Sequence, residues 1–191
     1  AGVRDLFAMG ARHVALVGAP GTGRSRLLRR VVELELPVYR PHGGAWVMRV
    51  GGGRGLLALL RGLASVLDVS LALCRGVEEA ITLIGVAVAA RAPILLAFDD
   101  LDAAGPRAHA AVQAWLQAAP SLRVLSVSLA PPAGAGGVYF AVAGLSLPDE
   151  GNADAVRWFE VVARRVRPSF RVQAGDLRPV FDLVRLLEGS P

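Results

Sequence analysis

The segment His13–Val32, HVALVGAPGTGRSRLLRRVV, constrains the fold more than any other part of the chain. A short apolar run is followed by a glycine-rich loop and then by a segment with helical spacing. The loop meets the phosphate-binding pattern G-x-x-x-x-G-K-[S/T] at Gly18, Gly23 and Ser25, and it departs from the pattern at Arg24, where lysine is required. In such loops the backbone N–H groups curl around phosphate oxygens and the hydroxyl group ligates Mg²⁺. The sequence therefore predicts a strand, a phosphate-binding loop and a helix.

Strand-like and helix-like segments alternate along the rest of the chain. We expect strands at His13–Gly18, Ala45–Val50, Pro93–Asp99, Leu122–Ser128 and Val138–Leu147. We expect helices at Ser25–Leu36, Gly55–Leu67, Gly76–Arg91, Pro106–Ala118, Ala153–Val166 and Leu177–Leu187. This alternation predicts an α/β fold, with a parallel sheet covered by helices on both faces.

The stretch ILLAFDDLD provides a second candidate for nucleotide chemistry. Its apolar run predicts a buried strand that ends in Asp99 and Asp100, at the sheet edge where the glycine loop also opens. Asp99 suits a Mg²⁺ ion, directly or through water, and Asp100 suits a water aligned on a γ-phosphate. Polar residues that merely end a strand would explain the acidic pair if it stood alone. The loop earlier in the chain favours the nucleotide interpretation.

Composition excludes several classes of protein. The chain has 191 residues, of which 53% are hydrophobic, and no uninterrupted apolar run is long enough for a membrane span. A single cysteine, Cys74, and the lack of an export signal favour the cytoplasm. The three histidines are scattered, so a metal site built from them is not expected. All 21 basic residues are arginine, but the net charge is only +5 and aromatic residues do not interleave the arginine clusters, so direct nucleic-acid binding is not expected.

The order of these blocks resembles the nucleotide-binding domain of STAND-class signal-transduction NTPases, as in bacterial transcriptional regulators of the AfsR and LuxR-MalT kinds. The blocks are LVGAPGTGRSRL, GGAWVMRV, ILLAFDDLD, AAPSLRVLSVS, LSLPDEGNADAVRWFEVVARRVRPSF and LLEGSP. The resemblance implies a three-layer P-loop NTPase core at residues 1–148, with a five-stranded parallel sheet of order 5-1-4-3-2, and the start of a helical lid at residues 149–191. It also implies that LLEGSP is a GxP turn, in which Gly189 and Pro191 approach the adenine.

These inferences assign a nucleotide site that takes ATP or ADP with Mg²⁺. The nucleotide-binding residues are Gly18, Ala19, Pro20, Gly21, Thr22, Gly23, Arg24, Ser25, Arg26 and Pro191; the metal ligands are Ser25 and Asp99; and the catalytic residue is Asp100. The other expected partners are further domains of the same larger chain, and self-association is left open.

Two departures from the family pattern bear on hydrolysis. Arg24 has a planar, longer head than lysine, which acts as a compact point charge. Leu129 stands where the family commonly has a γ-phosphate-sensing arginine. Replacing the lysine and losing the sensing arginine removes much of the electrostatic stabilisation that phosphoryl transfer needs, so binding is a firmer expectation than ATPase activity.

The leading hypothesis is an ATP/ADP-dependent switch module with weak or absent hydrolysis. One alternative is a degenerate P-loop scaffold that binds proteins and no nucleotide. Another is a DNA-handling ATPase of the AAA type, which the arginine clusters would favour.

Overall fold

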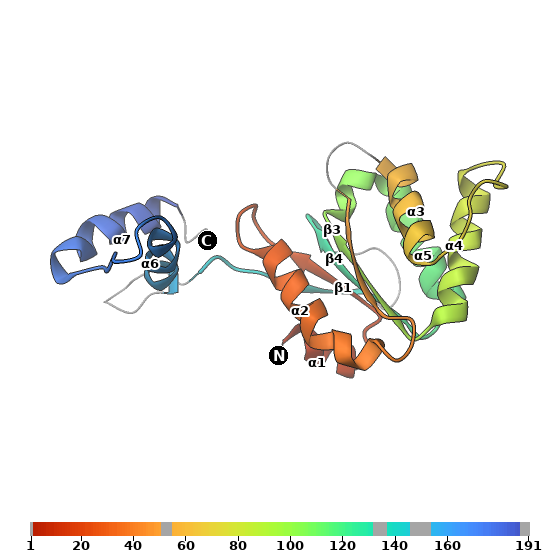
Figure 1. Ribbon diagram of the computed structural model, residues 1–191, viewed down its shortest axis with the longest axis horizontal. Coiled ribbons are helices and arrows are strands. Elements are labelled where there is room, and N and C mark those ends of the chain that lie inside the picture. The colour runs from red at the N-terminus through yellow and green to blue at the C-terminus, as the bar shows by residue number, and fades with distance from the viewer. Residues whose placement is uncertain (1, 51–54, 132–136, 146–153, 188–191) are drawn as a thin grey trace. The chain divides into compact units, whose positions relative to one another are not determined.

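A five-stranded sheet forms within residues 13–141 of the computed structural model, which describes residues 2–50, 55–131, 137–145 and 154–187 (Figure 1). Its strands are β1 (His13–Val17), β2 (Ala45–Arg49), β3 (Ile94–Asp99), β4 (Leu122–Ser128) and β5 (Gly137–Ala141). The strand order is β2-β3-β4-β1-β5 and every neighbouring pair is parallel. The expected order 5-1-4-3-2 is this order counted from the other edge, so the prediction of the sheet is confirmed.

Burial follows the position of each strand in the sheet. Every residue of β3 is buried, and so is every residue of β4 except Arg123, which is half-buried. Their apolar sequences, with little alternation, are those of strands covered on both faces. The edge strands β2 and β5 are partly exposed.

Helices cover both faces of the sheet, as the alternation predicted. The helices of the sheet region are α1 (Val3–Ala8), α2 (Arg24–Tyr39), α3 (Gly55–Val66), α4 (Val77–Arg91) and α5 (Pro106–Ala118), with a 3₁₀ turn, η1 (Leu101–Ala104), after β3. Side chains of consecutive strand residues point to opposite faces of the sheet, so those of Phe98 and Asp99 lie on different faces. Phe98 packs with Trp115 of α5 in the core that α3, α4 and α5 build, whereas Asp99 contacts α2.

Several element boundaries differ from the sequence-based expectations. Strand β5 ends at Ala141 instead of Leu147, because its neighbour β1 ends at the paired residue Val17. Helix α2 continues past its expected end at Leu36 through Pro37 to Tyr39, and a hydrogen bond of 2.8 Å from the Arg40 N–H to the Leu36 carbonyl keeps the last turn closed. Helix α1 was not expected at all.

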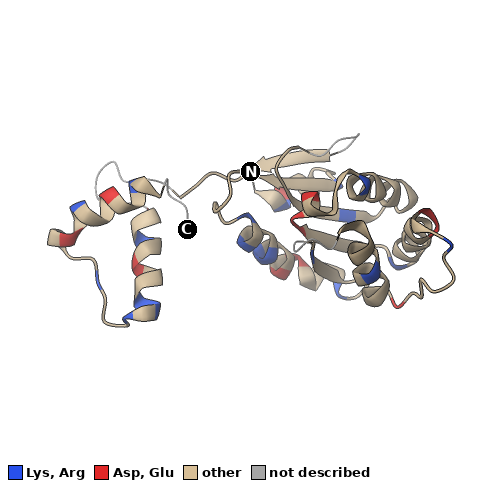
Figure 2. Ribbon diagram, turned by 90° about the horizontal axis from the view of Figure 1, so that it is seen from above, with Lys and Arg blue, Asp and Glu red and all other residues tan. Residues whose placement is uncertain are grey.

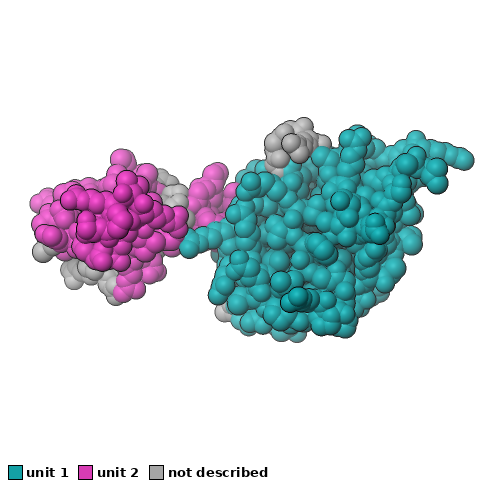
Figure 3. Space-filling view, viewed as in Figure 1, with its two compact units in different colours: residues 1–17, 25–141 teal, residues 18–24, 142–191 magenta. Residues whose placement is uncertain are grey.

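The chain divides into two compact units, coloured separately in Figure 3. The first comprises residues 1–17 and 25–141 and contains the sheet. The second comprises residues 18–24 and 142–191. It holds α6 (Asp154–Val166), a 3₁₀ turn, η2 (Ala174–Asp176), and α7 (Leu177–Leu186), whose small core contains Ala155, Val180 and Val184. The predicted boundary between residues 148 and 149 lies outside the described residues, and the lid stays a prediction.

Within the described residues, every helix is too short or too polar to cross a membrane.

Candidate functional site

The strongest candidate site begins with Ser25 and Asp99, the two side chains assigned to Mg²⁺. Ser25 lies in the first turn of α2, and Asp99 is the last residue of β3. The Ser25 Oγ donates a hydrogen bond of 2.6 Å to Asp99 Oδ1, across 74 positions of sequence. Asp99 is only 5% exposed. The sheet therefore brings the two side chains together in a buried polar contact that their sequence positions alone do not require.

The donor set fits a hard divalent cation. Mg²⁺ prefers oxygen ligands and usually binds through one or two carboxylates together with phosphates and water. A serine hydroxyl and one carboxylate supply such oxygens. No cluster of three His, Cys, Asp or Glu side chains suited to a metal is found in the described part of the chain. A magnesium ion at this position would therefore depend on phosphate and water oxygens for the rest of its coordination.

Arg29 adds a third group, which no motif in the sequence indicated. One of its guanidinium nitrogens, Nη2, lies 3.2 Å from Asp99 Oδ2. Arg29 lies on the polar side of α2, where its side chain is 47% exposed. Ser25 and Arg29 are four residues apart, so they share one face of the helix and reach the same carboxylate. That spacing was the signal available in the sequence.

The loop Gly18–Arg24 belongs to the second compact unit. A turn closes it, because both the N–H and the hydroxyl of Thr22 donate to the Ala19 carbonyl, at 3.3 and 2.9 Å. Gly21 and Gly23 have φ values of 85° and 87°. Glycines with positive φ at alternate positions allow successive N–H groups to turn toward one side, as they do in anion-binding nests.

Gly18 is required by a close contact within the same unit. A Cβ atom at this position would lie 2.3 Å from the Val142 carbonyl oxygen. Pro20 is exposed, Arg24 opens α2, and Arg26 is exposed on its first turn. Pro191 and Gly189 lie outside the described residues, so their predicted contact with adenine stays a prediction.

Asp100, the predicted catalytic residue, is exposed directly after β3. Its φ of 68° and ψ of 57° place it in the left-handed region, where aspartate is more frequent than most residues. Among the described residues, no hydrogen bond or ion pair is found for its carboxylate. Asp100 is exposed at the end of the strand that carries Asp99.

Leu129 follows β4, with its side chain 69% exposed. Its N–H donates to Asp102 Oδ2 at 2.6 Å, and the other oxygen of Asp102 lies 2.8 Å from His109 Nε2. Through these two hydrogen bonds, Asp102 of η1 connects the end of β4 to His109 of α5. The sequence pattern did not indicate this pair, although the turn at Gly105 and Pro106 that begins α5 brings its two members close.

Comparisons with known proteins leave the family open. No protein-family model matches the chain, and neither does any curated protein. Among solved structures, PCH-2 from C. elegans is similar over 86% of this chain, with 13% sequence identity and a TM-score of 0.47. The chain spans less than half, 42%, of that PCH-2 chain. A likeness this distant carries no conclusion about function.

A buried histidine lies at the start of β1, the strand that precedes the glycine loop. His13 begins β1, is 2% exposed, and its Nε2 is 2.9 Å from the hydroxyl of Ser126 on β4. Burial, with a smaller contribution from the charge of His109, lowers the pKa of His13 from 6.5 to about 4. His13 is therefore neutral at physiological pH.

Proposed function

We propose that the chain binds ATP or ADP with Mg²⁺ and acts as the nucleotide-dependent switch of a larger regulatory protein. The hydrogen bond between Ser25 and Asp99 carries this proposal, because it joins the hydroxyl of the loop motif to the carboxylate of the acidic strand. A magnesium-phosphate site needs these two oxygens at one place.

Each group has a defined role in the proposed site. The backbone N–H groups of Gly18, Ala19, Gly21, Thr22 and Gly23, with the side chains of Arg24 and Arg26, would bind the phosphates, and Pro20 would shape the loop. Ser25 and Asp99 would hold the Mg²⁺ ion. The ion supplies positive charge that neutralises the phosphate oxygens. Asp100 would orient a water molecule toward the terminal phosphate.

Hydrolysis is expected to be weak or absent at this site. Arg24 replaces the lysine that acts as a point charge on the phosphates. Leu129 presents an exposed apolar side chain at the position of the sensing arginine. With these cations changed, the developing charge of phosphoryl transfer has less stabilisation, while backbone N–H groups still favour binding.

We propose that the switch is cytoplasmic and belongs to a bacterial multidomain regulator, as the order of sequence blocks suggests. Nucleotide-linked movement of residues 142–191, with Pro191 near the adenine, would report the bound state to other domains. Such a shift requires the two arrangements to bind nucleotide with different affinity.

Calorimetric titration with ATP and ADP, with and without Mg²⁺, tests the proposal. We expect micromolar nucleotide binding by the native chain, and Mg²⁺ binding to the nucleotide complex about tenfold weaker in Ser25→Ala and in Asp99→Ala, because each loses an oxygen ligand of the metal. Ser121→Ala removes an exposed hydroxyl elsewhere and serves as the matched control. Unchanged Mg²⁺ affinity in both site variants, or no nucleotide binding by the native chain, would contradict the proposal.

A second candidate is a scaffold that keeps the fold and binds no nucleotide. The exposed Leu129 favours it, because a leucine offers nothing to a phosphate. The variant Arg24→Lys separates the two candidates. If the native chain does not bind nucleotide and Arg24→Lys does, then Arg24 is the cause of the lost binding. That result would favour the scaffold.

A further inference from the structure

The Arg29–Asp99 ion pair has no role in the function proposed above. Asp99 is buried, with its side chain 7% exposed, whereas the Arg29 side chain is 47% exposed. The two carboxylate oxygens have different partners, Ser25 at Oδ1 and Arg29 at Oδ2. A buried carboxylate therefore already has a permanent positive charge beside it, since a guanidinium stays protonated at accessible pH.

We infer that Arg29 is a tethered counter-ion of Asp99 that makes nucleotide binding largely independent of Mg²⁺. This inference rests on the proposed nucleotide site. A divalent cation at Asp99 would meet a carboxylate whose charge is balanced, and it would be repelled by the guanidinium. With one charge of each sign at the metal position, we expect divalent-cation affinity to fall by about tenfold or more relative to a lone carboxylate.

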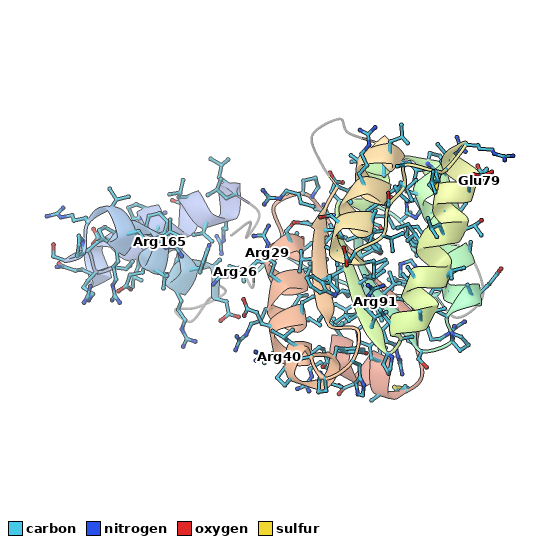
Figure 4. All side chains as sticks on the ribbon, turned by 45° about the vertical axis from the view of Figure 1, so that its right-hand side comes forward. Arg26, Arg29, Arg40, Glu79, Arg91 and Arg165 are labelled. Atoms are coloured by element: carbon cyan, nitrogen blue, oxygen red, sulfur yellow. The ribbon has the colours of Figure 1, made fainter. Side chains whose placement is uncertain are left out.

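The geometry of α2 sets Arg29 apart from its neighbours. Arginines recur at the start of this helix, as the blue segments of Figure 2 indicate, and Figure 4 shows Arg26 and Arg29 extending from the same end of it. The next residue, Arg30, pairs with Glu33, and both of these side chains are about two-thirds exposed, at 65% and 64%. Only Arg29, four residues after Ser25, pairs with the buried carboxylate among the described ion pairs of α2.

The guanidinium also replaces part of what the metal would do. A phosphate group bound near Ser25 would otherwise face the full negative charge of Asp99, and Mg²⁺ normally screens that repulsion. Arg29 screens it from within the chain. Nucleotide should therefore bind in the presence of a chelator nearly as well as in the presence of Mg²⁺.

The test compares ATP affinity in EDTA with ATP affinity in Mg²⁺, by calorimetry, for the native chain, Arg29→Gln and Arg30→Gln. Arg30→Gln is the matched control, because it removes the same charge from the adjacent position. We expect the two affinities to agree within about threefold for the native chain and the control. For Arg29→Gln we expect them to differ by about tenfold or more, in favour of Mg²⁺.

Two results would overturn the inference. The first is a native chain whose affinity already depends on Mg²⁺ by more than about tenfold, a measurement that does not require any variant to fold. The second is the same ratio in Arg29→Gln as in the native chain.

A titration with Mn²⁺ alone separates this inference from the proposed function. If the native chain binds no ATP in either buffer, the proposed function fails, and Mn²⁺ binding without nucleotide decides the role of Arg29. We expect Arg29→Gln to bind Mn²⁺ about tenfold more tightly than the native chain and Arg30→Gln, measured by electron paramagnetic resonance. Equal Mn²⁺ affinity in all three chains would contradict the counter-ion role.

Discussion

Among single residues, His13 makes the stability of the fold depend on pH. Its pKa is lowered from 6.5 to about 4 by burial, so between these values the unfolded chain binds a proton that the folded chain does not. The stabilising contribution is complete above pH 6.5 and is lost as the pH falls toward 4. A shift of this size corresponds to about 3 kcal/mol at most.

Urea unfolding between pH 4 and pH 7.5 checks this prediction. In His13→Asn we expect the free energy of unfolding to fall less steeply below pH 6.5 than in the native chain, even though the variant is less stable at pH 7. His42 is exposed, so His42→Asn should keep the native slope. Identical slopes for the native chain and His13→Asn would show that the buried imidazole does not cause the pH dependence.

At the scale of elements, Arg123 of β4 holds α1 against the sheet. Its Nη1 donates to the carbonyls of Phe7, at 2.7 Å, and Ala11, and its guanidinium lies 5.7 Å from the centre of the Phe7 ring. Arg123→Met leaves these carbonyls without the charged donor. We expect a loss of about 2 kcal/mol in the free energy of unfolding, measured with urea.

Arg107→Met is the control for the prediction about Arg123. Arg107 pairs with Glu78, and both side chains are exposed, so its removal should cost less than about 0.5 kcal/mol. Equal losses in the two variants would mean that Arg123 does not anchor α1.

Periodicity predicted most of the elements but not the contacts between them. Helix α5 begins and ends at the expected residues, because Pro106 suits the first position of a helix and β-like runs flank the segment. Helix α1 was missed, since six residues carry too little periodicity. The pairing of Arg29 with Asp99 was not predicted, because a helical wheel shows which residues share a face but not which strand end lies opposite that face.

For the whole molecule, the division into two units predicts that the sheet folds without residues 142–191. All buried residues of the core that α3, α4 and α5 build lie between Val50 and Val124, and the sheet pairing ends at Ala141. A chain that ends at Ala141 should keep a cooperative thermal transition by circular dichroism, with a Tm within about 5 °C of the first transition of the full chain.

The separate segment of residues 142–191 should behave differently. Of its described residues, only Ala155, Val180 and Val184 are buried, which is too little apolar surface for independent stability. We expect no cooperative transition for this segment. Loss of the transition in the chain that ends at Ala141 would contradict the division.

The sequence by itself determined the alternation of strands and helices, the glycine loop and the acidic strand end, because periodicity and motif spacing are local properties of the chain. The family resemblance gave the strand order. Only the tertiary structure decided which partners meet over long separations: Ser25 with Asp99, Arg29 with the same carboxylate, and His13 with Ser126. These contacts depend on sheet register and on the rotation of α2 about its axis. Packing of the whole core sets both, and no single segment encodes either.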